Sequence, residues 1–394
     1  MKLDNKNPSL CGEKDCVGCS SCEQSCPRHA ISMKYNREGY FNPIVDKDSC
    51  INCGICETHC PVLHPTAKNQ DPIKAYASWI NDEKIRSGSS SGGIFSALAQ
   101  NVLSQGGVVW GVGYSADMRP VYKCIDKTEA LPQLWGSKYV QCQIENCFKD
   151  IREELKSNRK VLFCGTPCHV AGLYSFLGDI SLEHLTTIDF VCHGVPSPLL
   201  FNNYIKWLER RYKDKVIDYK FRDSKFGINY NIGTSVVFKG KGKKYLYLTD
   251  NSYVLGFCGN KTIHGTCSSC KFDGLQRCSD FTIGDFHGAK GEYSPSEQFL
   301  GISCVIANNK KAEKTLKETD VYIKEIPIEK IIKSNPNYTS HKRFDTTLDL
   351  QEITNNDFEI VQKRYFKPSI RDIAKCFTLR LLGGKISYMI KNII

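Results

Sequence analysis

The spacing of apolar residues predicts a body of alternating helices and strands between residues 76 and about 200. Apolar positions that recur every three to four residues indicate helices, and short runs of consecutive apolar residues indicate buried strands. Helices are expected at 93–104, 144–157, 168–177 and 198–212, and strands at 107–114, 160–164 and 186–192. Because helices and strands that alternate along a chain pack in layers, the predicted fold class is α/β, mixed with α+β parts.

The pattern changes after residue 215. Residues 216–249 alternate like hairpin strands with a loop at 240–244, and residues 255–305 are predicted to be loop-rich. The last segment, 361–394, has the pattern of a basic amphipathic helix with a Gly-Gly interruption. Residues 87–116 carry no charge but lack about 18 consecutive apolar residues, so a buried helix and strand are predicted there and not a transmembrane span.

A cysteine motif is repeated near the start of the chain. Cys-x2-Cys-x2-Cys-x3-Cys-Pro spans residues 16–27 and returns at residues 50–61, with a short strand predicted at 40–45. Thiolates are the soft ligands of iron–sulfur clusters, and in this bacterial ferredoxin motif the fourth cysteine of each copy ligates the other cluster. Zinc sites instead use two Cys-x2-Cys pairs at longer separation. The repeat therefore predicts two [4Fe–4S] clusters. One is ligated by Cys16, Cys19, Cys22 and Cys60, and the other by Cys50, Cys53, Cys56 and Cys26.

Composition narrows the functional class. With 41% hydrophobic and 24% charged residues, the chain of 394 residues resembles an ordinary globular protein. Its 21 cysteines and the polar residues 1–10 do not fit a short secreted disulfide scaffold, so the reducing cytoplasm of an anaerobe is expected. The net charge of +11 suits an anionic cofactor or an acidic protein partner. No zinc-finger or RNP motif is found, which argues against nucleic acid as a partner.

Thirteen cysteines lie outside the repeat. Cys168 and Cys192 each follow a predicted strand, which places both at one edge of the sheet. Cys267 and Cys270 lie in the loop-rich stretch. From spacing alone three interpretations remain open. These four thiols hold a third cluster, or the last pair forms a structural zinc site with Cys278 or stays as buried free thiols.

A loop of small residues opens onto the predicted helix at 93–104. It consists of Ser90, Ser91, Gly92 and Gly93. Backbone N–H groups at a helix N-terminus bind anions, so this loop suits a flavin pyrophosphate. A flexible loop with a serine N-cap explains the same residues equally well. The Gly-Val-Gly at residues 111–113 is not taken as a dinucleotide fingerprint, because a strand pattern follows it where a helix is required.

Together these residues resemble the coenzyme F420 hydrogenase/dehydrogenase beta-subunit family, from residue 10 to about 335. The resemblance rests on the ferredoxin pair and on six further motifs. They are Ser90-Ser-Gly-Gly93, Gly136-Ser-Lys-Tyr-Val140, Gly165-Thr-Pro-Cys168, Cys192-His-Gly194, Cys267-x2-Cys270 and Gly284-Asp-Phe286. The chain is most similar to the bacterial branch often encoded near surface-polysaccharide genes. Related enzymes include deazaflavin-oxidising subunits and 7-hydroxymethyl chlorophyll a reductase.

The resemblance implies an FAD and an additional [4Fe–4S] cluster in the α/β body. The cluster ligands it implies are Cys168, Cys192, Cys267 and Cys270. The flavin contacts it implies are Ser90, Ser91, Gly92, Gly93, Lys138, Gly165 and Thr166. Lys138 would offset negative charge on the reduced ring or on the phosphates of the flavin. The alternative interpretation of Lys138 is an exposed lysine without a role in binding. The expected domains are a ferredoxin module at 7–66, a flavin and cluster domain at 67–335, and a basic tail at 336–394.

Two departures from the family pattern leave substrate specificity open. His287 stands where an aromatic residue is expected, and Cys278 is additional. His287 and His193 are interpreted as hydrogen-bonded scaffold and are left out of the metal ligands. No residue is assigned as the proton donor.

Two functions fit the implied cofactors. In the first, the chain is a flavin-dependent oxidoreductase between a two-electron substrate, a deazaflavin or another hydride carrier, and a redox partner protein or small molecule. Flavin suits this position because it exchanges electron pairs for single electrons. In the second, the chain is a non-catalytic ferredoxin-like relay subunit of a larger complex, with clusters but no flavin. The intact Ser-Gly-Gly and Gly-Thr-Pro-Cys segments favour the first.

The basic end of the chain adds one more alternative. Residues 361–394 hold eight Lys or Arg residues and a single acidic residue, Asp372. A basic amphipathic helix can lie on an anionic membrane surface. A solvated or partner-binding helix explains the composition as well, so peripheral membrane contact is the less favoured interpretation.

Overall fold

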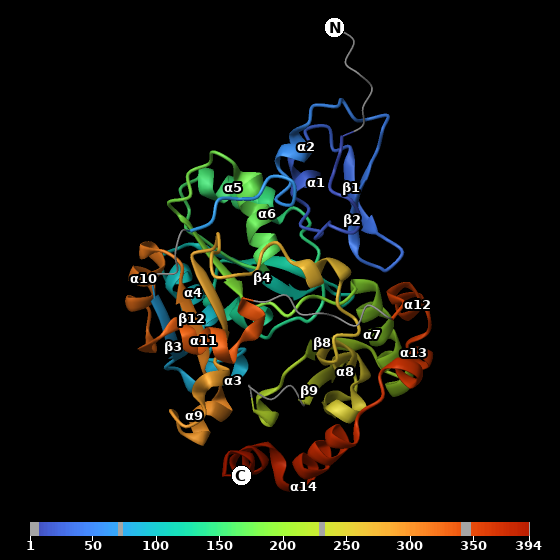
Figure 1. Ribbon diagram of the computed structural model, residues 1–394, viewed down its shortest axis with the longest axis vertical. Helices are drawn as coiled ribbons and strands as arrows, with labels where there is room; N and C mark the ends of the chain where they lie inside the picture. The colour runs from blue at the N-terminus through green and yellow to red at the C-terminus, as the bar shows by residue number, and fades with distance from the viewer. Residues whose placement is uncertain (1–7, 70–73, 228–232, 340–347, 394) are drawn as a thin grey trace.

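The computed structural model describes residues 8–69, 74–227, 233–339 and 348–393, with side chains in the last range described to residue 387. Figure 1 shows a layered body with the N-terminal module (residues 8–66) at one end and the last helix at the opposite end. Among the helices of these ranges, none is both long and apolar enough to cross a membrane.

The N-terminal module consists of a two-stranded sheet and two short helices. β1 (Ile31–Tyr35) and β2 (Phe41–Val45) pair antiparallel, and α1 (Ser21–Ser25) and α2 (Ile55–Thr58) lie within the two cysteine loops. Gly18 and Gly54 have φ angles of 68° and 74°, a left-handed backbone that glycine adopts without strain. These two glycines let the loops turn tightly beside the thiols.

The body is built on one eight-stranded sheet with the spatial order β13-β3-β12-β11-β7-β6-β4-β5. The strands are β3 (Lys74–Ile80), β4 (Val108–Tyr114), β5 (Pro120–Ile125), β6 (Val161–Cys164), β7 (Leu185–Phe190), β11 (Phe281–Asp285), β12 (Ser303–Ala307) and β13 (Val321–Ile326). β4, β6, β7 and β11 pair in parallel, and the outer pairs are antiparallel. This mixed sheet confirms the predicted α/β class.

Helices cover both faces of the sheet, because successive strand residues point to opposite sides. Val109 packs in one apolar cluster with α4 (Ile94–Ser104) and α10 (Lys310–Lys317). Val108 packs in another with α5 (Cys147–Lys156) and α6 (Pro167–Leu177). α3 (Glu83–Gly88) follows β3, α9 (Pro295–Leu300) precedes β12, and α11 (Ile328–Ser334) packs on β3 and β12. Short 3-10 turns are η1 (Thr128–Leu134), η2 (Ser224–Phe226), η3 (Leu248–Asp250), η4 (Gly265–Ser269), η5 (His287–Ala289) and η6 (Pro336–Tyr338).

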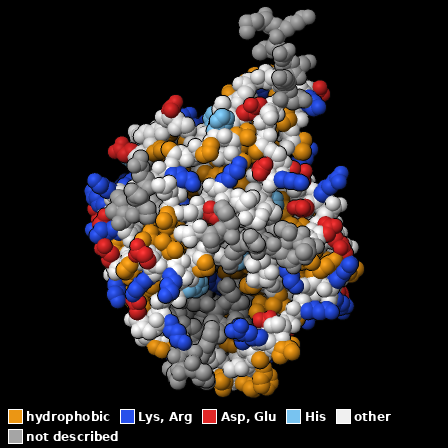
Figure 2. Space-filling model, in the orientation of Figure 1, with side chains coloured by type: hydrophobic (Ala, Val, Ile, Leu, Met, Phe, Trp, Pro, Cys, Tyr) orange, Lys and Arg blue, Asp and Glu red, His pale blue; other side chains and the backbone are white. Residues whose placement is uncertain are grey.

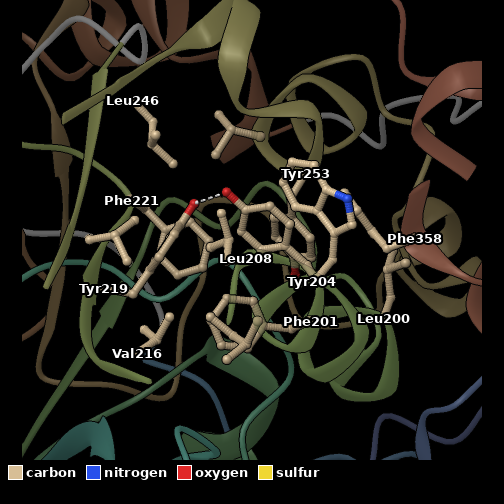
Figure 3. Packing of buried hydrophobic residues seen from close by; sticks show 14 of the residues in the cluster. Leu200, Phe201, Tyr204, Leu208, Val216, Tyr219, Phe221, Leu246, Tyr253 and Phe358 are labelled. Atoms are coloured by element: carbon tan, nitrogen blue, oxygen red, sulfur yellow. Dashed lines mark hydrogen bonds between the residues drawn. The ribbon is translucent and has the colours of Figure 1, made fainter. Parts of the chain in front are cut away.

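A second, three-stranded antiparallel sheet carries its own core. Its strands are β8 (Val216–Lys220), β9 (Gly233–Phe238) and β10 (Gly242–Tyr247). Its helices are α7 (Pro198–Tyr212), α8 (Ser252–Cys258), α12 (Leu350–Asn355), α13 (Phe358–Tyr365) and α14 (Ile370–Ile393). Figure 3 shows the aromatic packing, in which the Tyr219 hydroxyl donates to that of Tyr204 at 3.5 Å. Buried Phe358, Val361 and Leu379 join this cluster, so the segment expected as a tail packs on the body.

Most elements predicted between residues 76 and 215 are confirmed, and α7 has the predicted bounds of 198–212. The stretch 255–305 is loop-rich as predicted, but it also contains two strands, β11 and β12, that its residue pattern does not predict. β11 and β12 are central strands, but they are short, and β11 (Phe-Thr-Ile-Gly-Asp) lacks a continuous apolar run. The predicted loop at 240–244 is too long, because residues 242–244 belong to β10, which begins at Gly242. Its lysines lie on an edge strand, where charged side chains are favoured.

Candidate functional site

One large cavity lies at the carboxyl ends of the central strands. It has a volume of about 580 Å³, and Cys164 at the end of β6, Phe190 at the end of β7 and Asp285 at the end of β11 border it. The carboxyl ends of parallel strands are where α/β sheets bind ligands. Cavities of about 300–1,000 Å³ are typical of cofactor sites. The position and size therefore suit a cofactor with its substrate.

Two helices begin at this cavity without a side-chain cap. The N-cap of α4 is Gly93, with a φ of 79°, and the N-cap of α6 is Thr166, whose side chain makes no capping hydrogen bond. Both residues border the cavity. The serine N-cap considered as an alternative for the small-residue loop is therefore wrong. The first N–H groups of a helix lack intrahelical partners and attract anions, so both ends favour a phosphate-bearing ligand.

Hydrogen bonds hold the small-residue loop against the segment that carries Lys138. The Ser137 N–H donates to Ser90 Oγ at 2.9 Å, and the two hydroxyl oxygens lie 3.1 Å apart. The Ser91 hydroxyl donates to the carbonyl of Ile302 at 3.0 Å, which fixes the loop to the start of β12. Two segments distant in sequence thus form one wall of the cavity.

The predicted flavin contacts fall into two groups. Those that border the cavity are Ser90, Ser91, Gly93, Lys138, Gly165 and Thr166. Gly92 lies behind it. Its N–H donates to Ser303 Oγ at 2.9 Å, and a Cβ at this position would overlap the carbonyl oxygen of Ser78. Gly92 is thus a packing residue between the loop and strands β3 and β12.

Lys138 is held at the cavity wall by backbone carbonyls. Its Nζ donates to the carbonyl of Trp135 at 2.8 Å and that of Leu134 at 3.3 Å. Burial lowers the pKa of Lys138 to about 7, although the negative charge of Asp218 opposes the shift. Lys138 therefore changes its charge close to neutral pH.

A buried ion pair, not anticipated from the sequence, also borders the cavity. Arg222 forms two hydrogen bonds with the carboxylate of Asp285, at 2.7 and 3.0 Å. Burial alone would raise the pKa of Asp285. The positive charge and the hydrogen bonds of the Arg222 guanidinium together have the larger effect, so the pKa of Asp285 is lowered. Asp285 belongs to the Gly-Asp-Phe motif. Nothing in the sequence around Arg222 identifies it, because its partner is 63 positions away.

Four cysteines from three segments meet at the same cavity, and we call them the body site. They are Cys168 in α6, Cys192 after β7, and Cys267 and Cys270 at η4. Burial raises the pKa of Cys168, and the charges of the other three thiols raise it further. Four thiols this close cannot all ionise unless a cation balances them. Such a group fits a positively charged iron centre.

Hydrogen-bond donors surround the sulfur atoms of the body site. They are Gly194 N to Cys192 Sγ at 3.4 Å, Phe272 N to Cys270 Sγ at 3.4 Å, and Thr166 Oγ1 with Cys168 Sγ at 3.1 Å. Donors to ligand sulfur atoms tune the reduction potential of an iron–sulfur cluster. The local backbone is therefore arranged to accept negative charge on these sulfurs.

The eight cysteines of the repeat separate into two groups. The proximal site contains Cys16, Cys19, Cys22 and Cys60, whose thiols perturb one another's pKa or that of Cys11 beside them. The distal site contains Cys26, Cys50, Cys53 and Cys56, which border one small pocket. Each group joins three cysteines of one copy to the fourth of the other. This is the exchange expected of the ferredoxin motif.

Cys11 is a fifth thiol at the proximal site. A hydrogen bond with Cys16 raises the pKa of Cys11 to about 12, and Cys60 also hydrogen-bonds to it. No motif identifies Cys11, because it lies five residues before the first repeat.

Within the described ranges, no group of three or more His, Cys, Asp or Glu side chains is placed to hold a single metal ion.

The proximal site and the body site are adjacent. A Cβ at Gly172, one turn after Cys168 on α6, would lie 2.8 Å from Cys19 Cβ and 3.1 Å from its sulfur. The Thr266 hydroxyl, next to Cys267, lies 3.4 Å from the carbonyl oxygen of Cys16. Figure 1 shows α6 directly beneath the N-terminal module. The distal site is more open, since Cys53 is exposed and Ile51 is 53% exposed.

The two histidines and the additional cysteine lie close to these groups. His193 and His287 both border the cavity, and His193 Nδ1 lies 3.1 Å from Asn337 Nδ2. Cys278 packs in the apolar cluster that links the proximal and body sites, and burial raises its pKa to about 12.

Profiles of known protein families match three stretches of the chain. Residues 15–63 match a 4Fe-4S dicluster domain. Residues 75–149 match the N-terminal part, and residues 158–331 the C-terminal part, of the coenzyme F420 hydrogenase/dehydrogenase beta subunit. The chain belongs to the coenzyme F420 hydrogenase/dehydrogenase beta-subunit family. It is thus an iron–sulfur electron-transfer protein from a family of oxidoreductase subunits, as the sequence motifs predict.

Solved structures also resemble this chain. A chain of the F420-reducing [NiFe] hydrogenase complex from Methanosarcina barkeri, in a xenon-derivatised structure, is 15% identical. The match has a TM-score of 0.44 and covers 74% of this chain and 91% of that chain. No curated protein matches this member of the beta-subunit family.

Proposed function

We propose that this protein is a flavin-dependent iron–sulfur oxidoreductase with one FAD and three [4Fe–4S] clusters. The observation that carries the proposal is the shared cavity, which is bordered both by two uncapped helix ends and by the four thiols of the body site. When bound, the FAD would exchange electron pairs with a deazaflavin or another hydride carrier for the single electrons that clusters accept.

The residues of the cavity have separable tasks in this proposal. The N-terminal ends of α4 and α6 offer N–H groups to the pyrophosphate. Lys138, when protonated, adds a positive charge at the same wall. The Arg222–Asp285 pair holds the end of β11 rigid beside the ligand.

The thiol sites are proposed to connect this cavity to a redox partner. The body site borders the cavity, the proximal site contacts α6, and the distal site is exposed. This order leads from the buried cavity to the surface around Cys53 and Ile51. A partner protein that exchanges electrons would therefore dock on the distal side of the N-terminal module.

Replacing Lys138 by alanine is expected to weaken flavin retention about tenfold, because a charged hydrogen bond contributes about 1.5–3 kcal/mol. With a pKa of about 7, Lys138 is charged below that pH and neutral above it. Flavin binding by the unaltered protein should therefore be tighter below pH 7 than above. The amount of flavin released on dialysis, measured for the unaltered protein and the variant at each pH, tests the effect of the substitution and the effect of pH. Lys127→Ala, at an exposed lysine, is the control. Equal flavin retention by Lys138→Ala and the control would remove Lys138 from the site.

A leucine at position 172 is expected to disturb the contact between the proximal and body sites. Its side chain would collide with Cys19, and overpacking of this kind costs about 1–3 kcal/mol of stability. Stopped-flow reduction of the N-terminal module, compared per cluster after iron analysis, should slow. Gly265→Leu is the control, because a Cβ there meets nothing within 4 Å. An unaltered rate in Gly172→Leu would show that electrons do not cross at α6.

A further inference from the structure

The last helix, α14, is fixed to the body along one side. Cys376 and Leu379 are 1% and 4% exposed and belong to the core of the smaller sheet. Arg380 forms an ion pair with Asp250 at 2.7 Å. Beyond the kink at Gly383, where φ is 72°, the next residue packs against the backbone of η2. The orientation of α14 on the body is therefore defined.

The opposite side of α14 is also apolar, and it faces solvent. Ile370, Ile373, Phe377 and Leu381 are spaced three, four and four residues apart, which places them on one face of the helix. They are 87%, 51%, 62% and 67% exposed. Leu382 and Ile386 are exposed as well. Figure 2 shows hydrophobic side chains gathered at the end of the molecule where α14 lies.

This concentration is unusual for a protein surface. Sixteen large hydrophobic residues of the described ranges are exposed, and six of them lie between residues 370 and 386. Exposed apolar residues are normally scattered singly, and a contiguous patch marks an interaction surface. The buried side of α14 already packs on the body of the protein. The exposed apolar side of the helix therefore has no contact partner among the described residues.

The charges around the apolar face favour an anionic membrane surface. Arg371 and Lys385 are exposed and Lys375 is partly exposed on the same helix. Asp372 is the single acidic residue of 361–394, and its carboxylate accepts hydrogen bonds from the backbone N–H and the hydroxyl of Ser369 at the start of the helix. Lysine and arginine beside a buried apolar stripe reach toward lipid headgroups. A second copy of the chain would bring two strongly positive segments together, which electrostatic repulsion opposes.

We propose that α14 binds the surface of an anionic lipid bilayer, with Ile370, Phe377 and Leu381 inserted at the headgroup boundary. The helix lies in the plane of the interface and does not span the bilayer. The N-terminal module is at the opposite end of the molecule (Figure 1), so the distal site faces away from the membrane. A protein partner can then reach the distal site while the body is held at the bilayer.

Cosedimentation of the full chain with vesicles tests this surface. We expect binding to vesicles of equal parts phosphatidylglycerol and phosphatidylcholine, and at least about tenfold weaker binding to pure phosphatidylcholine, since each basic residue near an anionic surface contributes about 1 kcal/mol. Phe377→Glu combined with Leu381→Glu should weaken binding at least about tenfold, because the variant removes two inserted apolar side chains and adds two negative charges. Ile44→Glu, a similarly exposed residue of the N-terminal module, is the matched control.

The outcomes separate the possible occupants of the face. Circular dichroism and iron content of the double variant should equal those of the unaltered protein, which shows that the fold is intact. A double variant that binds vesicles as well as the control would overturn the proposal. Failure of the unaltered protein to bind anionic vesicles would also overturn the proposal. In that case sedimentation velocity could show that the unaltered protein forms a dimer and that the double variant does not. That last result would assign the face to a second copy of the chain.

Discussion

Replacing Cys267 and Cys270 together by serine is expected to remove about four of about twelve iron atoms, because each cubane holds four. The two residues contribute half of the body-site thiols. The N-terminal clusters should remain, since their ligands belong to residues 16–60. Electrons from a two-electron donor should no longer reach the N-terminal module, while direct chemical reduction of that module should persist. Iron analysis and EPR of the reduced protein measure both effects.

The matched control for this change is Cys124→Ser, at an exposed cysteine of β5 that does not border the cavity. This variant should keep the full iron content and full electron transfer. If the paired serine variant also kept about twelve iron atoms, the body site would not hold a cluster, and these cysteines would be buried free thiols.

Asp285→Ala is expected to destabilise the protein by about 3–5 kcal/mol, because removing one partner leaves the other charge buried and unpaired. The side chains of Asp285 and Arg222 are only 17% and 8% exposed, and they share two hydrogen bonds. The loss should appear as a lower midpoint in urea unfolding of the anaerobic protein.

A second substitution separates the charge effect from the shape of the site. Arg222→Met added to Asp285→Ala removes the unpaired charge and should recover a large part of the lost stability. Equal stability of the single and double variants would mean that the guanidinium is accommodated without the carboxylate. Asp117→Ala, which breaks an exposed ion pair with Arg119, should change stability by less than about 1 kcal/mol.

Sequence patterns predict those helices, loops and ligand groups whose formation depends on residues close together in the sequence. The cysteine repeat indicates both groups of ferredoxin ligands because each group draws on two short motifs. Helices such as α4 and α7 were predicted because their apolar faces repeat along more than ten residues. The small-residue loop was recognised because its glycines and serines directly precede a helix.

Other parts depend on contacts between distant segments, which a single sequence does not encode locally. β11 is a strand because β7 and β12 pair with it on either side, although its own residues lack a strand pattern. Arg222 is a cavity residue only because β11 brings Asp285 to it. The family resemblance places Gly92 at the flavin with its neighbours, but Gly92 packs against β3 and β12 and does not border the cavity.

The measurement that tests the central claim most directly is anaerobic purification followed by iron, acid-labile sulfide and flavin analysis. Three cubanes with four iron atoms each and one FAD predict about twelve iron atoms and one flavin per chain. About eight iron atoms without flavin would contradict the proposed enzyme. The chain would then be a ferredoxin-like relay subunit, and its cavity would serve another ligand.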